Sequence, residues 1–163
     1  MATIGYALPY IIPAICVFLS FLFGVMSKRD SSRQKVKLLR YETLYIPIMQ
    51  KLVAGLCWRY SPSTLSQESR AVFFELITNN SHLLGRDSAK LLPDYYLAFL
   101  NLLEMEFENP LYRNASEQFD KIFNNIIYNT LLEAQELSAS LKYPNLPKTI
   151  LELYETEIER NKQ

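Results

Sequence analysis

Apolar residues recur every three or four positions through most of the chain after residue 31, and they rarely alternate over the length of a strand. Such spacing predicts amphipathic helices, because residues three and four apart share one face of a helix. Residues 1–27 differ, since they form a largely apolar run without a charged side chain. We therefore expect an all-α protein in which a single N-terminal transmembrane helix precedes a compact domain of about five helices.

The N-terminal run predicts a membrane anchor. A helix rises about 1.5 Å per residue, so the span from Ile4 to Met26 can cross a hydrocarbon core of about 30 Å. Pro9 and Pro13 lie in its first half, where they predict a kink or the start of the helix. A cleaved signal peptide and a buried core helix are the alternatives. Signal peptides carry basic residues before the apolar run, whereas here they follow it, which favours the anchor.

A basic collar follows the anchor, because residues 28–40 contain six basic residues and one acidic residue, a net charge of +5. Lys and Arg beside a membrane-spanning end resist translocation, which predicts an N-terminus outside and a C-terminal domain in the cytoplasm. Such a collar also predicts contact with anionic lipid head groups. The expected lipid-binding residues are Lys28, Arg29, Arg33, Lys35, Lys37 and Arg40. The expected division is thus an anchor (1–27), a collar (28–40) and a cytosolic α-helical domain (41–163).

The first helix of this domain is expected from about Ser32 to Tyr60. Its apolar seam covers about two heptads, fewer than a coiled coil needs, so core packing is its expected role. Pro47 lies inside this helix and predicts a kink or a break. The seam residues are Leu38, Tyr41, Tyr45, Ile48 and Leu52.

Local signals place the start of the next two helices. Thr64 with Gln67 three residues later has the form of a capping box, which predicts a helix from Leu65 to about Thr78. Pro93 is expected at the first position of the following helix, where its fixed φ is favourable. The expected buried face of the earlier helix comprises Val72, Phe73, Leu76 and Ile77.

The remaining helices are expected over residues 94–107, 114–141 and 147–160. The first of them is apolar on nearly all sides, which predicts a central position in the core. Asn114, at the start of the second, and Asn145, before the third, are the expected N-caps. The expected buried stripes are Phe119, Ile122, Phe123, Ile126, Ile127, Ala134, Leu137 and Leu141 in the longer helix, and Ile150, Leu151, Tyr154 and Ile158 in the last.

Composition narrows the chemistry. Residues 41–163 carry 11 basic and 16 acidic residues, a net charge of −5, which argues against a nucleic-acid partner. The two cysteines, Cys16 in the anchor and Cys57 in the domain, form no disulfide framework. With a single histidine as well, a zinc site is not expected.

Two polar groups are the candidates for catalysis, and solvated surface is the favoured interpretation of both. His82 with Arg86 and Asp87 is the first, and it would need a converging pocket to act. Glu104 and Glu108 lie one helical turn apart and are the second, but no histidine stands near them in the sequence to complete a di-iron pattern. No phosphate loop, dinucleotide fingerprint or nucleophile elbow is present. We therefore expect no catalytic residue, metal or cofactor.

Trp58, Arg59 and Tyr60 close the first expected helix, and they are the candidate contacts with a protein partner if they are exposed. The favoured hypothesis is a single-pass membrane protein whose cytosolic helical domain binds another protein or a second copy of itself, without being an enzyme. The alternatives are a membrane-bound enzyme acting through His82 or through Glu104 and Glu108, and a pore or lysis protein assembled through its anchor.

Overall fold

The computed structural model describes residues 28, 30–55, 57–107 and 110–160. The chain divides into two units, residues 1–37 and 38–163. Within the first unit, residues 30–37 are helical. The expected anchor, residues 1–27, lies outside the described residues, and in the part of the chain that is described no helix is long and apolar enough to cross a membrane. The fold that follows is that of the second unit.

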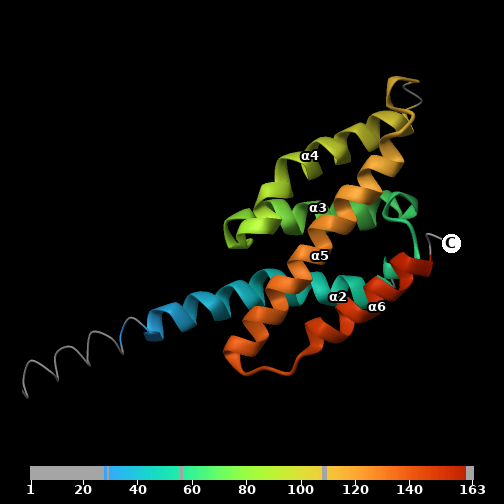
Figure 1. Cartoon of the computed structure of the whole chain (residues 1–163). Coiled ribbons are helices and arrows are strands. Elements are labelled where there is room, and N and C mark those ends of the chain that lie inside the picture. The colour runs from blue at the N-terminus through green and yellow to red at the C-terminus, as the bar shows by residue number, and fades with distance from the viewer. Residues whose placement is uncertain (1–27, 29, 56, 108–109, 161–163) are drawn as a thin grey trace, which may run out of the picture. The chain divides into compact units, whose positions relative to one another are not determined.

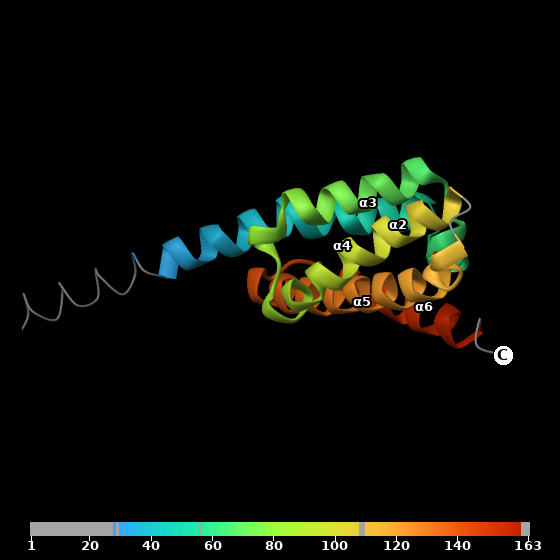
Figure 2. The ribbon, with the colours of Figure 1, turned by 90° about the horizontal axis from the view of Figure 1, so that it is seen from above.

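Every regular element described in the second unit is helical (Figures 1 and 2), which confirms the expected all-α class. Short 3₁₀ turns connect several of the helices. Between residues 46 and 160, apart from the undescribed positions 56, 108 and 109, there are five α-helices and no strand. With the labels of Figure 1 they are α2 (Ile46–Gly55), α3 (Gln67–Asn79), α4 (Arg86–Glu106), α5 (Ala115–Leu141) and α6 (Leu146–Arg160).

Helix α5 organises the core, because it packs against both α4 and α6 (Figure 1). Phe123 of α5 meets Phe73 of α3 edge to face, with ring centroids 5.4 Å apart, and Phe119 stacks with Tyr95 of α4 at 6.1 Å. Aromatic pairs in this distance range add to the stability that burial provides. The expected α5 stripe is confirmed as core by the buried Phe119, Phe123, Ile126, Ile127, Ala134 and Leu137, with Ile122 and Leu141 half-buried at its edge.

The last helix also follows the expected pattern. Helix α6 begins at Leu146, next to the expected Pro147, and it buries Ile150, Leu151 and Tyr154. The side chain of Ile158 lies outside the described residues. The Tyr154 hydroxyl donates to the side-chain oxygen of Asn124 at 2.6 Å, which ties α6 to α5.

The first helix changes from α-helical to π-helical geometry just before Pro47, where a kink or a break was expected. Tyr41–Tyr45 form a π-helical turn, in which the N–H of Ile46 donates to the carbonyl oxygen of Tyr41 five residues earlier. Pro47 has no N–H to donate and its ring crowds the preceding turn, so the wider turn relieves the conflict. The seam is kept, with Tyr41, Tyr45, Ile48 and Leu52 buried and Leu38 half-buried. The helix ends at Gly55 and not at the expected Tyr60.

The expected start of α3 was wrong by two residues. Thr64 lies in the 3₁₀ turn Pro62–Thr64, and its hydroxyl donates to the carbonyl oxygen of Ser61. The N-cap is Ser66, whose hydroxyl oxygen accepts from the N–H of Ser69 at 3.2 Å. On the expected buried face only Phe73 and Ile77 are buried, while Leu76 is half-buried and Val72 is exposed.

The expected start of α4 was also wrong. The helix begins at Arg86, so Pro93 lies in its interior and not at its first position. Two backbone N–H groups at this helix start, those of Gly85 and Ser88, donate to the carboxylate of Glu133 on α5. A cap supplied by a distant residue leaves no local sequence signal. Asn114 does precede α5, but its side chain makes no capping hydrogen bond.

Candidate functional site

The residues of the histidine cluster predicted from the sequence are exposed on the surface. His82 is exposed on the 3₁₀ turn Ser81–Leu83, and Arg86 and Asp87 are exposed at the start of α4. Asp87 accepts from Lys90 at 2.7 Å, and this hydrogen bond lowers the pKa of the Asp87 carboxyl. These positions fit the favoured interpretation of a solvated surface.

The carboxylate pair is described in part. Glu104 is exposed on α4, and Glu108 lies outside the described residues. Among the residues that the structure does describe, no group of three or more His, Cys, Asp or Glu side chains could hold a metal ion.

The predicted partner contacts follow the end of α2. These contacts were Trp58, Arg59 and Tyr60, which were expected to close the first helix. Because α2 ends at Gly55, they instead occupy the 3₁₀ turn Cys57–Arg59 and the position after it. Arg59 and Tyr60 are exposed, and the side chain of Trp58 lies outside the described residues.

One member of the basic collar belongs to the folded domain. The Arg40 guanidinium donates to the carbonyl oxygen of Leu83 at 2.7 Å and to the Tyr45 hydroxyl at 2.9 Å. The Arg40 side chain therefore stabilises the second unit through these two hydrogen bonds. Of the other predicted lipid contacts, Lys28, Arg33 and Lys35 are exposed, Lys37 is half-buried and Arg29 lies outside the described residues.

A polar network that the sequence did not reveal is centred on Glu133. Its carboxylate accepts from the Tyr45 hydroxyl at 2.7 Å, from the Gly85 N–H at 2.7 Å and from the Ser88 N–H at 3.2 Å. Burial, followed by the nearby Glu133 charge, raises the pKa of Tyr45, so that its hydroxyl is a donor at neutral pH. One carboxylate on α5 thus accepts hydrogen bonds from the π-helical turn and from the start of α4, and it joins the three elements.

A second polar network joins α3, α4 and α5. Arg70 is 3% exposed and pairs with Glu106, and it also donates to the carbonyl oxygen of Ser63 at 3.1 Å. Asp120 accepts from the Ser63 N–H at 2.6 Å and from the Ser63 hydroxyl at 2.9 Å. Burial raises the pKa of the Asp120 carboxyl, although these bonds and Arg70 oppose the rise. This network fixes the loop before α3.

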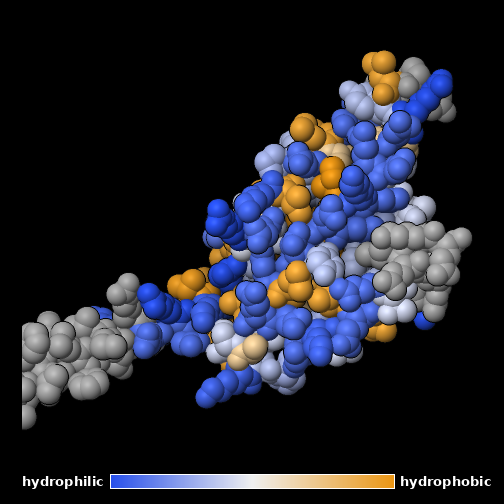
Figure 3. All heavy atoms as spheres, in the orientation of Figure 1, coloured by the Kyte–Doolittle hydropathy of each residue, from blue (hydrophilic) through white to orange (hydrophobic). Residues whose placement is uncertain are grey.

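Helix α4 is buried on one side only, which corrects the expectation of a central position in the core. Tyr95, Ala98, Phe99 and Leu102 are buried. On the opposite side Tyr96, Leu97 and Leu100 are 48%, 56% and 40% exposed, and we call these three residues the α4 face. Figure 3 shows hydrophobic residues on the surface over α4. Large apolar side chains exposed together in this way are typical of interaction surfaces.

The α4 face rests on an aromatic base. The half-buried ring of Phe74 on α3 stacks on Phe99 with ring centroids 4.2 Å apart. The same ring contacts Tyr96 at 5.4 Å. Tyr96 is thereby held against the half-buried Phe74, so this side chain has less rotational freedom to lose when a partner binds.

Comparisons with protein-family models, curated proteins and solved structures gave no match for this chain.

Proposed function

We propose that the protein is a single-pass membrane protein whose cytosolic helical domain holds a protein partner at the membrane face, without catalysis of its own. The observation that carries this proposal is the α4 face. Helix α4 contributes to the core on one side and exposes Tyr96, Leu97 and Leu100 on the other. Exposed large apolar residues beside a Tyr ring have the composition of a protein interface.

Charge indicates the kind of partner. Residues 41–163 carry 16 acidic and 11 basic residues. A partner with a basic surface around an apolar contact would be attracted to this domain and would orient on it. This chemistry fits a protein better than a nucleic acid, whose phosphates the acidic domain would repel.

The N-terminal sequence supplies the tether in this proposal. A cytosolic domain attached to an anchor meets other membrane proteins at a raised effective concentration, so a modest interface can suffice. The basic collar would hold the start of the domain near anionic lipid head groups. We leave Arg40 out of this lipid contact, because its guanidinium is engaged with Leu83 and Tyr45.

The test is site-specific photocrosslinking of the full chain in its source cells. A p-benzoylphenylalanine replacing Leu97 should give one discrete protein adduct, and the same group replacing Leu132, an exposed leucine of α5, should not. Adding Leu100→Asp to the Leu97 probe should abolish the adduct, because a charge would enter the apolar contact. The adduct mass distinguishes a second copy of the chain from another protein.

Equal yields from the two probe positions, or no adduct from Leu97, would contradict the proposed interface. The enzyme alternative has its own signature. It predicts that His82→Ala or Glu104→Gln inactivates the protein in cells while the fold and the adduct stay intact. That result would replace the proposed partner-binding role with a catalytic one.

A further inference from the structure

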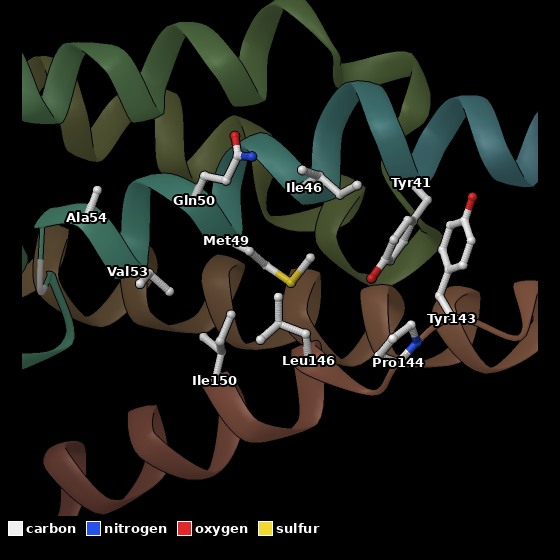
Figure 4. A pocket seen from close by; sticks show the side chains of 10 residues that line it. All are labelled: Tyr41, Ile46, Met49, Gln50, Val53, Ala54, Tyr143, Pro144, Leu146 and Ile150. Carbon is white, nitrogen blue, oxygen red and sulfur yellow. The ribbon is translucent and has the colours of Figure 1, made fainter.

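An apolar groove of about 640 Å³ lies between α2 and α6 (Figure 4). Ile46, Met49 and Val53 line it from α2, while Leu146 and Ile150 line it from α6. Among the residues that the structure describes, none that lines this groove is charged. Binding sites for small ligands are typically 300 to 1,000 Å³, mostly apolar, and supplied with a few polar groups, and this groove has those properties.

One end of the groove is polar. The rings of Tyr41 and Tyr143 stand there 5.6 Å apart, next to Pro144. Figure 4 shows the Tyr41 hydroxyl directed into the groove, whereas the Tyr143 hydroxyl and the Gln50 amide point away. Burial raises the pKa of Tyr41, and the nearby Tyr143 adds to the rise. The hydroxyl that enters the groove is therefore protonated at neutral pH and can donate a hydrogen bond.

We propose that this groove binds one uncharged aliphatic chain that ends in an oxygen acceptor, the chemistry of a long-chain alcohol. The chain lies along Met49, Val53 and Ile150, and its oxygen accepts from the Tyr41 hydroxyl. A carboxylate or ammonium head is disfavoured, because an unpaired charge loses its hydration in a lining without a countercharge. The terminus of a chain also suits a groove with one polar end, whereas a partner helix would need an apolar trough throughout.

Two matched variants, each with tryptophan in place of an exposed alanine, test the site without removing a core residue. Ala54 lines the groove and is exposed, so Ala54→Trp places a large ring at the rim of the groove. Ala89 is an exposed alanine of α4 that does not line the groove, so Ala89→Trp is the control. The full chain is reconstituted in phosphatidylcholine nanodiscs, and the probe is hexadecanol carrying a mid-chain diazirine.

After illumination, mass spectrometry should find adducts on peptides that contain Met49, Val53 or Ile150. Ala54→Trp should lower this labelling at least about tenfold, equivalent to about 1.4 kcal/mol of binding free energy, and Ala89→Trp should leave it unchanged. Unlabelled hexadecanol should compete, while hexadecanoate and hexadecylamine should compete weakly. Tyr41→Phe should remove the preference for hexadecanol, since it removes the donor and keeps the ring.

Three results would overturn the proposal. They are absence of adducts on the groove peptides, equal labelling of Ala54→Trp and the parent chain, and equal competition by hexadecanoate and hexadecanol. A p-benzoylphenylalanine at position 54 that captures a protein in cells, in place of a lipid, would assign the groove to a protein partner. The groove and the α4 face comprise different residues on different helices, so failure of one test leaves the other proposal intact.

Discussion

Gly85 is held so close to Glu133 that a methyl group on it would overlap the carboxyl. The carboxyl cannot move away freely, because it accepts from Tyr45, Gly85 and Ser88. We expect Gly85→Ala to lower the free energy of unfolding by about 1.5 to 3 kcal/mol, the range for hydrogen bonds to a charged group. Urea denaturation of a fragment comprising residues 28–163 measures the loss.

A double-mutant cycle identifies the cause of that loss. In a Glu133→Ala background the added methyl meets no carboxyl, so Gly85→Ala should cost much less than in the parent chain. An equal loss of unfolding free energy in both backgrounds would show that the effect comes from the backbone at position 85 and not from the contact with the Glu133 carboxyl.

Asp120 should make stability fall as the pH rises. Its ordinary pKa is 3.8, and burial raises the pKa in the folded state. Between these two values the folded protein binds more protons than the unfolded chain, so the free energy of unfolding falls through that window. Asp120→Asn keeps an acceptor for the Ser63 N–H and a donor for its hydroxyl, and it removes the titration. The variant should therefore gain stability over the parent as the pH rises through the window.

Asp87 provides a control of opposite sign. Its pKa is lowered, chiefly by Lys90, so its contribution is present above the ordinary value and is lost as the pH falls. Urea midpoints of Asp87→Asn and Asp120→Asn across a pH series starting below 3.8 should thus diverge from the parent in opposite directions. A shift of Asp120→Asn in the same direction as Asp87→Asn would contradict the raised pKa.

At the scale of an element, Pro93 lowers the stability of helix α4, because it lies in the helix interior. Pro93 is exposed inside the helix and supplies no N–H to the carbonyl four residues earlier. Pro93→Ala should restore this bond and raise the free energy of unfolding by about 1 to 3 kcal/mol, within the propensity difference between Pro and Ala. If the helix instead began at Pro93, where proline is favourable, the same change would be neutral or destabilising.

The elements that could be predicted from the sequence are those whose signals are local. The apolar stripe of α5 follows from its spacing and is observed. The chemistry of Pro47 predicted an irregularity in the first helix, and the structure shows it as a π-helical turn and not as a break. The start of α4 was missed because its cap comes from Glu133, which lies 48 residues after Gly85 in the chain. Burial of Arg70 was missed for the same reason, since its partner Glu106 lies on another helix.

The candidate surfaces were missed for a related physical reason. Apolar composition shows that α4 can be buried, but which of its sides is buried depends on where α3 and α5 pack. The exposed Tyr96, Leu97 and Leu100 therefore could not be separated from the buried Tyr95 and Phe99 in advance. The groove between α2 and α6 likewise exists only once the chain has folded back at the turn before Leu146.

For the whole molecule, the uneven distribution of charge leads to a prediction about its orientation in the membrane. Residues 28–40 carry a net charge of +5 after an uncharged run, and residues 41–163 carry −5. Basic residues resist translocation, so a reporter active only in the cytoplasm, fused after Gln163, should be active. Activity of an export-dependent reporter at that position would overturn the orientation.

The tether itself is tested by exchange. If the anchor serves only to hold the domain at the membrane, replacing residues 1–27 by an unrelated anchor of the same orientation should preserve the Leu97 adduct in cells. Deleting those residues should reduce it strongly, because the partner would then meet the domain at its bulk concentration. The reporter fusion verifies the orientation of each anchor, and the unfolding midpoint of the fragment comprising residues 28–163 verifies that the domain survives the deletion. An adduct of full yield from the anchorless chain would show that the interface needs no membrane, and the tethering proposal would fail while the α4 face remained a binding surface.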